Sequence, residues 1–400
     1  MTFNPSQKIL DNWANVLVNF AANGGSGVKP GQSILINIGE SAKPLLLSVY
    51  RAVLAAGAHP IVLYQPDLLS KELFSNASDE QLSFYPKAYY DGIVDQADCL
   101  IFVRAEVDKK ELVGIDPKKL LLRQKAFKPY MDRRRVKENA GNFTWVLTSY
   151  PTQSVANEAG LTLEQYWQQV IQACYLDSSD PVSEWKRVFS QIDATKAALD
   201  DLEIESLHII APGTDLTVKL GPNRRWLGGS GRNLPSFELY ISPDWRGTSG
   251  TVTFTEPLYV YGNLVKDVTL TFRNGVASLA KASQGEAVLL EMIRQKNADK
   301  IGEFSLTDKR LSRITKFMAD TLFDENVGGS HGNMHLALGN AYQDSYPGDA
   351  SRVDAQSWED WGYNSSSVHT DIVATTPRIV TATLKDGTHK VIYKDGVFTV

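Results

Sequence analysis

Cysteine is nearly absent from this chain, since only Cys99 and Cys174 occur among its 400 residues. Both stand in apolar surroundings, so we expect buried thiols rather than a disulfide or zinc ligands. Long apolar runs are also missing, and no window approaches the roughly 18 uninterrupted apolar residues that indicate a membrane-spanning helix. The first 20 residues lack the basic start and continuous apolar stretch of a signal peptide and predict an amphipathic helix. We therefore expect a cytoplasmic protein without a membrane partner.

A strong excess of charge of either sign is lacking as well. The chain has 41 Lys and Arg against 46 Asp and Glu, a formal net charge of -5, which argues against nucleic acid as a partner. One basic run, residues 118–137, contains few aromatic side chains, so we interpret it as a solvent-facing helical surface. The apolar content of 43% is enough for sizeable cores. Because single cores rarely exceed about 250–300 residues, the length predicts two domains.

Residues 1–195 are predicted to form an α/β domain with a mainly parallel sheet. Short apolar runs predict strands at residues 33–38, 60–64, 99–103 and 143–148, and helical periodicity covers residues 42–56. Strands separated by helical segments indicate right-handed crossovers between parallel strands. A further helix at residues 182–199 has Asp180 as its N-cap and Pro181 at its first position. We place the domain boundary at the end of this helix, after residue 195.

Residues 196–400 are predicted to form an α+β domain with an antiparallel sheet. Hairpin turns are indicated at three dipeptides flanked by β-rich runs: Asn274-Gly275, Asp386-Gly387 and Asp395-Gly396. A long helix is predicted over residues 308–323, where four apolar residues recur at helical spacing: Leu311, Ile314, Phe317 and Met318. The candidate functional residues all lie in this second domain.

Histidine is scarce, with six residues in all, so the motif VHTDIV is informative. On a strand, the spacing of His369 and Asp371 places both side chains on one face, where an imidazole beside a carboxylate suits zinc, cobalt or manganese. His335 stands in a second dense motif, HLALGNAY. Glu238 and Glu303 stand among apolar residues of predicted strands, where a buried carboxylate needs a partner or a cation. Together these five residues predict a two-metal hydrolase site, because two ions about 3.5–4 Å apart can clamp a hydrolytic transition state.

Each of these residues also has an ordinary structural interpretation. His369 and Asp371 alone would suit a half-exposed strand pair, and Glu325 alone would be a solvated helix end. Asn364 and the serines that follow it could orient the ligands from outside. Tyr342, seven residues after His335, is the best candidate for a phenol that donates to a developing oxyanion.

Two glycine-rich segments match motifs of other enzyme classes without the required context. Residues 328–332 have the G-x-S-x-G pattern of a serine hydrolase, but that motif needs a strand before it and a helix after it. Residues 24–27 precede the first predicted strand, whereas a dinucleotide-binding loop follows it. We therefore expect no cofactor other than metal ions.

Four sequence motifs, taken together, resemble those of the M29 family of metallo-aminopeptidases, of the aminopeptidase T and aminopeptidase S type. They are GRNLPSFE ending at Glu238, IGEFSLT containing Glu303, DENVGGSHGNMHLALGNAY from Asp324 to Tyr342, and NSSSVHTD ending at Asp371. The motifs follow the order of the family. The resemblance extends along the whole chain and is most specific over residues 228–375.

The resemblance implies a metal-dependent aminopeptidase that removes N-terminal amino acids from peptides with a free N-terminus. It implies two divalent ions per chain, which could be zinc, cobalt, manganese or magnesium. The implied ligands are Glu238, Glu303, Glu325, His335, His369 and Asp371. Glu303 would bridge the ions, Tyr342 would assist catalysis, and the general base would be Glu303 or a neighbour. The resemblance further implies a homodimer whose active sites face an enclosed cavity.

Two other functions stay open at this point. His335, His369 and Asp371 would by themselves form the facial triad of a mononuclear iron(II) ring-cleaving dioxygenase. We favour the hydrolase because a single-iron site has no use for the three glutamates. A non-catalytic binding protein is the second alternative, and it would leave the converging metal-type side chains without a purpose.

Overall fold

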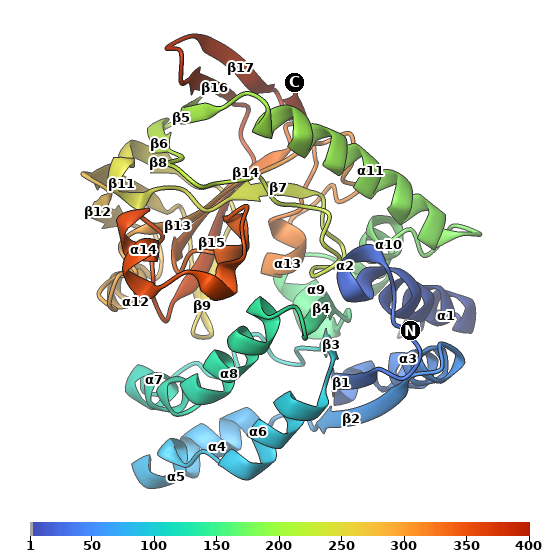
Figure 1. Ribbon diagram of the computed structural model, residues 1–400. Helices are drawn as coiled ribbons and strands as arrows, with labels where there is room; N and C mark the ends of the chain where they lie inside the picture. The colour runs from blue at the N-terminus through green and yellow to red at the C-terminus, as the bar shows by residue number, and fades with distance from the viewer. Residues whose placement is uncertain (1–2) are drawn as a thin grey trace. The chain divides into compact units, whose positions relative to one another are not determined.

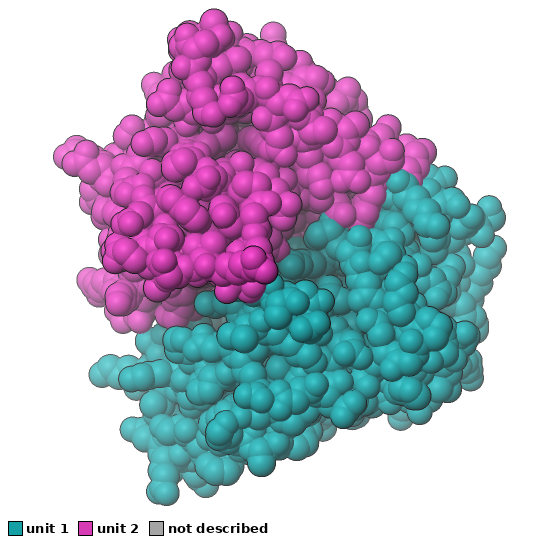
Figure 2. All heavy atoms as spheres, viewed as in Figure 1, with its two compact units in different colours: residues 1–186, 230–235, 261–263 teal, residues 187–229, 236–260, 264–400 magenta. Residues whose placement is uncertain are grey.

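The structure is a computed structural model that describes residues 3–400, which form two compact units (Figure 2). The first unit contains residues 1–186, 230–235 and 261–263, and the second contains residues 187–229, 236–260 and 264–400. Each unit therefore includes chain segments from both sides of residue 195. The division into domains at that residue stays a prediction.

The first unit is built on a four-stranded parallel sheet with the order β2-β1-β3-β4 (Figure 1). The strands are β1 (Ser33–Gly39), β2 (His59–Gln65), β3 (Cys99–Arg104) and β4 (Thr144–Ser149). All three strand pairs are parallel, so the predicted α/β character of the first half is confirmed. The helix between the first two strands, α3 (Lys43–Ala55), also forms as its periodicity predicts.

Helices make up most of the rest of the first unit, and only some of them bury side chains. Besides α3, they are α1 (Gln7–Val16), η1 (Leu17–Ala21), α2 (Ala22–Gly25), η2 (Glu40–Ala42), α4 (Leu69–Asn76), α5 (Asp79–Ser83), α6 (Lys87–Gln96), α7 (Pro117–Ala126), α8 (Lys128–Asn139), α9 (Gln153–Glu158) and α10 (Leu163–Ala173). The amphipathic α1 buries Trp13, whose ring packs edge-on against Trp167 of α10 and parallel to Tyr150. The next helix, α11 (Pro181–Asp200), begins as predicted, because the Asp180 carboxylate accepts a hydrogen bond from Ser183 N at 3.1 Å.

Both cysteines are buried free thiols within the described part of the chain. Cys99 begins the central strand β3, and Cys174 follows α10 directly. Burial raises the pKa of the Cys99 thiol to about 12 and raises that of Cys174 as well. Neither side chain is therefore a thiolate near neutral pH.

The basic run on α7 and α8 binds the ends of other helices. Lys119 Nζ donates to Phe74 O at 2.8 Å near the end of α4, and Arg123 Nη1 donates to Phe84 O at 2.9 Å beyond α5. Lys137 Nζ donates to three carbonyls at the end of α6, those of Val94 (2.9 Å), Asp95 (3.0 Å) and Ala97 (2.6 Å). These cations satisfy carbonyls that have no partner inside their own helix. The run is therefore a structural clamp and not simply a solvent-facing surface.

The second unit contains two antiparallel sheets, which confirms the α+β character predicted for the second half. An eight-stranded sheet has the order β12-β11-β8-β6-β5-β16-β17-β18, and a four-stranded sheet has the order β15-β14-β13-β7. The strands are β5 (Ile204–Ala211), β6 (Thr214–Lys219), β7 (Glu238–Ile241), β8 (Ser249–Thr253), β11 (Thr269–Arg273), β12 (Val276–Lys281), β13 (Ile301–Thr307), β14 (Asn333–Gly339), β15 (His369–Ala374), β16 (Ile379–Leu384), β17 (His389–Lys394) and β18 (Val397–Phe398), besides the separate pair β9 (Leu258–Val260) and β10 (Asn263–Val265). The short helices are α12 (Glu286–Ile293), α13 (Thr321–Asp324), α14 (Ala355–Asp360), η3 (Trp245–Gly247), η4 (Gln343–Ser345) and η5 (Ala350–Arg352).

The three turn dipeptides join consecutive strands of the eight-stranded sheet, as predicted, but at the β16–β17 turn only Gly387, and not Asp386, has a positive φ. At the β11–β12 turn, Asn274 and Gly275 have φ angles of 51° and 81°. At the β17–β18 turn, Asp395 and Gly396 have φ angles of 49° and 86°. Positive φ at both central residues matches the right-handed twist of the flanking strands.

The long helix predicted over residues 308–323 is wrong, because this stretch is mostly irregular and contains only the first three residues of α13. Its backbone groups bond to other segments instead of to the next helical turn. Lys309 N donates to Gly396 O at 2.9 Å, and the Asp324 carboxylate accepts from Met318 N at 2.6 Å. Ala319 has a φ of 52°, which interrupts a right-handed helix. The apolar spacing reflects burial of separate side chains such as Ile314 and Met318, not one helical stripe.

In residues 3–400, none of the helices combines the length and the apolar character needed to cross a bilayer.

Replacement of Lys137 by Met is expected to lower the free energy of unfolding by about 1–2 kcal/mol, because three carbonyls at the end of α6 lose a charged donor. Urea denaturation measures the change. Lys125→Met on the exposed side of α7 removes the same charge and should leave stability nearly unchanged. An equal effect of both substitutions would show that net charge, and not the clamp, is responsible.

Candidate metal centre

Five of the predicted site residues project from the four-stranded sheet of the second unit. Glu238 begins β7, Glu303 lies in β13, His335 lies in β14, and His369 and Asp371 lie at the start of β15. These strands are neighbours in the order β15-β14-β13-β7. Segments far apart in sequence therefore meet on one sheet.

The register of the strands places these side chains on one face. On β14, His335 is opposite Ser305 of β13, and Ala337 is opposite both Glu303 and Asp371. Paired residues of neighbouring strands point to the same face, and alternate residues along a strand do so as well. The small side chain of Ala337 therefore lies between two carboxylates and leaves room beside them. The alternate residues of β14, such as Leu336, are buried on the opposite face.

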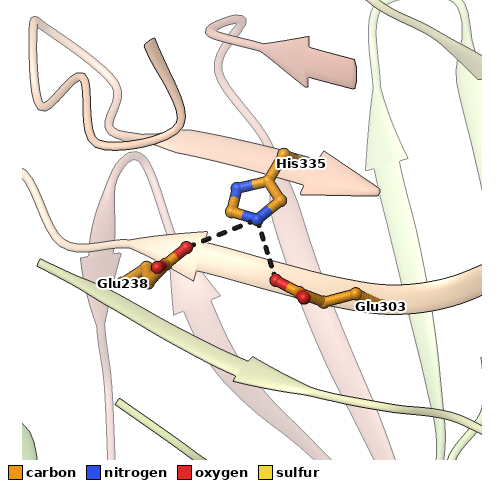
Figure 3. Close-up of side chains that lie close together, drawn as sticks. All are labelled: Glu238, Glu303 and His335. Carbon is orange, nitrogen blue, oxygen red and sulfur yellow. Dashed lines mark hydrogen bonds and ion pairs between the residues drawn. The ribbon is translucent and has the colours of Figure 1, made fainter. Parts of the chain in front are cut away.

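The side chains approach closely enough to share ions (Figure 3). His335 Nε2 lies 3.0 Å from Glu303 Oε1 and 3.4 Å from Glu238 Oε2. The other oxygen of Glu303, Oε2, lies 3.6 Å from His369 Nε2. Asp371 Oδ1 lies 3.5 Å from His369 Nε2 and 3.9 Å from His335 Nε2. Each oxygen of Glu303 thus faces a different imidazole.

Glu325, the sixth predicted ligand, comes from outside the sheet. It follows α13 directly and is 5% exposed, so the solvated helix end expected from its position alone is wrong. One of its carboxylate oxygens lies within 4.8 Å of ligand atoms of His335 and Asp371. The structure therefore brings all six predicted ligands together.

The six side chains form three overlapping groups whose ligand atoms lie within 4.8 Å of one another. These groups are Glu238, Glu303 and His335; Glu303, His369 and Asp371; and Glu325, His335 and Asp371. Mixed imidazole and carboxylate ligands suit zinc, cobalt or manganese. The buried Asp371 Oδ1 has no hydrogen-bond partner within residues 3–400, as expected for an oxygen that faces a cation. The residues present therefore fit a metal site.

His369 is oriented by a backbone carbonyl. Its Nδ1 lies 2.8 Å from Asn340 O, and a carbonyl only accepts hydrogen bonds, so Nδ1 carries a proton. In the neutral imidazole, the lone pair is then on Nε2, which faces Glu303 and Asp371. The predicted role of Asn364 is indirect, because its amide donates to Gly339 O and Asn297 O and not to a ligand side chain.

Three serines beside the site were missed by the sequence reasoning. Ser236 Oγ donates to Glu238 Oε1 at 3.3 Å, and Ser305 Oγ lies 3.5 Å from Glu238 Oε2. Ser242 Oγ accepts from Tyr342 N at 2.8 Å. The alternation of a strand could have identified Ser305, which stands two residues after Glu303 on the same face.

Tyr342 lies beside the imidazole of His369, with 4.8 Å between the ring centroids. The ring centroid of Tyr240 lies 5.8 Å from that of Tyr342. Burial and the charges of Glu303 and Asp371 raise the pKa of Tyr342 well above its usual value. The phenol therefore keeps its proton and can donate a hydrogen bond.

The crowding of acids changes the protonation of the site. Burial raises the pKa of Glu238 to about 8 and raises that of Glu325 well above its usual value. Burial would lower the pKa of His335, but the hydrogen bond to Glu303 and the surrounding carboxylates outweigh it and raise this pKa to about 9. Asp371 and Glu303 likewise overcome burial and raise the pKa of His369 to about 9. Protons on the imidazoles thus offset the acidic charge where no metal does.

Comparison with known proteins gives one consistent result over almost the whole chain. The family model of the thermophilic metalloproteases, M29, matches residues 6–398. Aminopeptidase PepS of Streptococcus thermophilus is 28% identical, and the match covers 98% of each chain. Aminopeptidase T of Thermus aquaticus is 28% identical over 96% of this chain and 98% of its own. The solved structure of wild-type AmpT from Thermus thermophilus has the same fold, with a TM-score of 0.86 at 24% identity over 98% of this chain and 100% of that one.

Metal binding is expected to stabilise the protein more at pH 9 than at pH 6. Unfolded His has an ordinary pKa of 6.5, so the stability that protonated His335 and His369 provide is lost as pH rises through their folded pKa of about 9. Glu238 acts in the same direction, because its pKa is raised from 4.5 to about 8 and the folded state keeps a proton that the unfolded state releases.

Thermal unfolding with and without cobalt measures this effect. The Tm of the metal-free protein should fall between pH 6 and pH 9, and the increase in Tm caused by cobalt should be larger at pH 9. The variant His389→Gln, which changes an exposed histidine, serves as the control. Equal cobalt-induced increases at both pH values would contradict the proton–metal exchange.

Proposed function

This chain belongs to the M29 family of thermophilic metalloproteases and is a metal-dependent aminopeptidase, and from this premise we propose that it works with two divalent ions. The observation that carries the proposal is the position of Glu303. Its two carboxylate oxygens lie 3.0 Å from His335 Nε2 and 3.6 Å from His369 Nε2, so one carboxylate serves two imidazoles. This is the arrangement expected of a carboxylate that bridges two ions.

In the proposed site, each ion would have its own set of ligands and Glu303 would belong to both sets. One set is Glu238, Glu303 and His335, the other is Glu303, His369 and Asp371, and Glu325 adds a further oxygen beside His335 and Asp371. Four carboxylates carry a formal charge of -4 when ionised, which two divalent cations would neutralise. The charge balance therefore favours two ions over one.

When bound, the two ions would lower the pKa of a shared water and polarise the scissile carbonyl. Tyr342 supplies a neutral phenol beside His369, in a position to donate to the oxyanion of the tetrahedral intermediate. A carboxylate, either Glu303 or a neighbour, would take a proton from the attacking water and give it to the leaving amine. The substrates are peptides with a free N-terminus, whose amine in its neutral form would bind to the ions.

Three further properties belong to the proposal because the resemblance implied them or the composition favoured them. The protein acts as a homodimer, its active sites face an enclosed cavity, and it works in the cytoplasm. The physiological metal is zinc, cobalt, manganese or magnesium, all of which bind carboxylate-rich mixed sites.

The comparisons give no support to the iron(II) dioxygenase, and the family consists of proteases. A single-iron site made of His335, His369 and Asp371 would also leave Glu238 and Glu325 as buried acids without a function. The non-catalytic binding protein is disfavoured by membership of an enzyme family.

Metal add-back tests the proposed reaction. Protein stripped with a chelator should be inactive, and titration with cobalt, zinc or manganese should restore release of leucine from leucine amide up to two metals per chain. N-acetyl-leucine amide, which lacks the free amine, is the matched substrate control and should not be cleaved. Full activity at one metal per chain would refute the two-ion proposal, and cleavage of the acetylated substrate would refute the requirement for a free N-terminus.

Glu303→Gln should lose at least one ion and lower kcat by more than about 100-fold, since even outer residues of metal sites cost up to that factor. The amide nitrogen of Gln cannot ligate, so only one of the two oxygens remains. Metal analysis of the dialysed variant and steady-state kinetics measure both effects. Glu291→Gln, a half-exposed change on α12, should keep two ions and normal kcat. Near-normal activity of Glu303→Gln would exclude the bridging role.

A further inference from the structure

Glu325 differs from the other five proposed ligands in the support that its backbone receives. The other five lie on paired strands of one sheet, whereas Glu325 follows the four-residue helix α13 at the end of an irregular segment. One oxygen of its carboxylate nevertheless lies within 4.8 Å of ligand atoms of His335 and Asp371, and the carboxylates of the site repel one another when ionised. Something other than secondary structure must hold Glu325 against this repulsion.

The carbonyl oxygen of Glu325 is bound by side chains from two strands of the site. Thr307 Oγ1, at the end of β13, donates to it at 3.1 Å, and Asn333 Nδ2, at the start of β14, donates to it at 2.9 Å. Asn333 also donates to Val327 O at 2.8 Å. Both Thr307 and Asn333 are fully buried. The peptide group of Glu325 is thus tied to the strands that carry Glu303 and His335.

Asn326 extends this connection to the strand of a further ligand. Its side-chain oxygen accepts from Phe237 N at 2.6 Å, immediately before Glu238, and its Nδ2 donates to Leu322 O in α13 at 3.0 Å. Asn326 is fully buried as well. One amide therefore connects the residue beside Glu238 with the residue beside Glu325, so neither segment shifts without breaking a buried hydrogen bond.

We propose that Thr307, Asn326 and Asn333 are positioning residues that hold Glu325 and Glu238 at a fixed separation for metal binding. The proposal rests on the proposed two-ion function. A glutamate side chain has three rotatable bonds, so its oxygen is placed accurately only when its backbone is fixed. We call these three residues the frame. Without the frame, the repulsion between the carboxylates would be relieved most easily by movement of Glu325, because its segment is not paired with a strand. The frame therefore determines how tightly the ion beside Glu325 is held.

Thr307 allows a closely matched test. Thr307→Val keeps the shape of the side chain and removes the hydroxyl donor, whereas Thr307→Ser keeps the donor. We expect Thr307→Val to weaken one of the two cobalt ions by about 10- to 100-fold, the range for partners that orient ligands. Thr307→Ser should restore near-normal affinity for both ions. Chelator competition on the full-length protein measures each affinity without an assay of activity.

Thr152→Val controls for the loss of a buried hydrogen bond as such. Thr152 is buried and its Oγ1 donates to Glu106 O, a residue of the same first unit, so the variant removes a similar bond outside the segments that carry the ligands. It should leave both cobalt affinities unchanged. If Thr307→Val does not fold, Asn326→Ser, which shortens the connection to Phe237, takes its place and should show the same selective loss.

The outcomes separate this inference from the proposed function. Two tightly bound ions in the wild-type protein, with one weakened in Thr307→Val and recovered in Thr307→Ser, support the frame. Two tightly bound ions in the wild type and unchanged affinities in both Thr307→Val and Asn326→Ser overturn the frame and leave the two-ion function intact. A wild-type protein that binds fewer than two ions overturns both.

Discussion

The repulsion among four carboxylates, three of them buried and that of Asp371 half-buried, is the constraint on which the rest of the second unit depends. Glu238, Glu303, Glu325 and Asp371 are gathered around two imidazoles, in an interior where unpaired charge is costly. A flexible scaffold would separate them. Antiparallel pairing prevents this for the residues on strands, because their positions follow from a register fixed by a buried apolar face. The pairing of the strands therefore fixes the positions of these carboxylates. Their negative charge needs a compensating positive charge, which protons or metal ions supply.

Some of this arrangement can be predicted from the sequence. The i, i+2 spacing of His369 and Asp371 predicts two side chains on one face of a strand, and β15 has that form. A glutamate within an apolar strand predicts either a buried partner or a cation, and Glu303 has both imidazoles beside it. The surroundings of Glu325 cannot be predicted from local sequence patterns, because they depend on hydrogen bonds from segments elsewhere in the sequence. Only the family resemblance identified it as a ligand.

In the fold as well, features that depend on local sequence were predicted correctly, and a feature that depends on distant contacts was not. Parallel strands and the turn dipeptides were predictable because burial of a whole strand and positive φ at Asn-Gly or Asp-Gly are local properties. The helix expected over residues 308–323 failed because long-range bonds satisfy its backbone, including the one from Lys309 N to the β17–β18 turn. Apolar periodicity records which side chains are buried, and it does not record where the peptide groups find their partners.

The two buried cysteines make it possible to measure how often the structure around them opens. A thiol reacts as the thiolate, and burial holds Cys99 far from ionisation at neutral pH while covering it with core residues. Alkylation therefore requires that the surrounding structure open first. Both cysteines belong to the first unit, whereas the proposed metal ligands belong to the second. The rate of thiol alkylation thus measures how often the first unit opens. A comparison of this rate with and without metal reveals whether the two units open together.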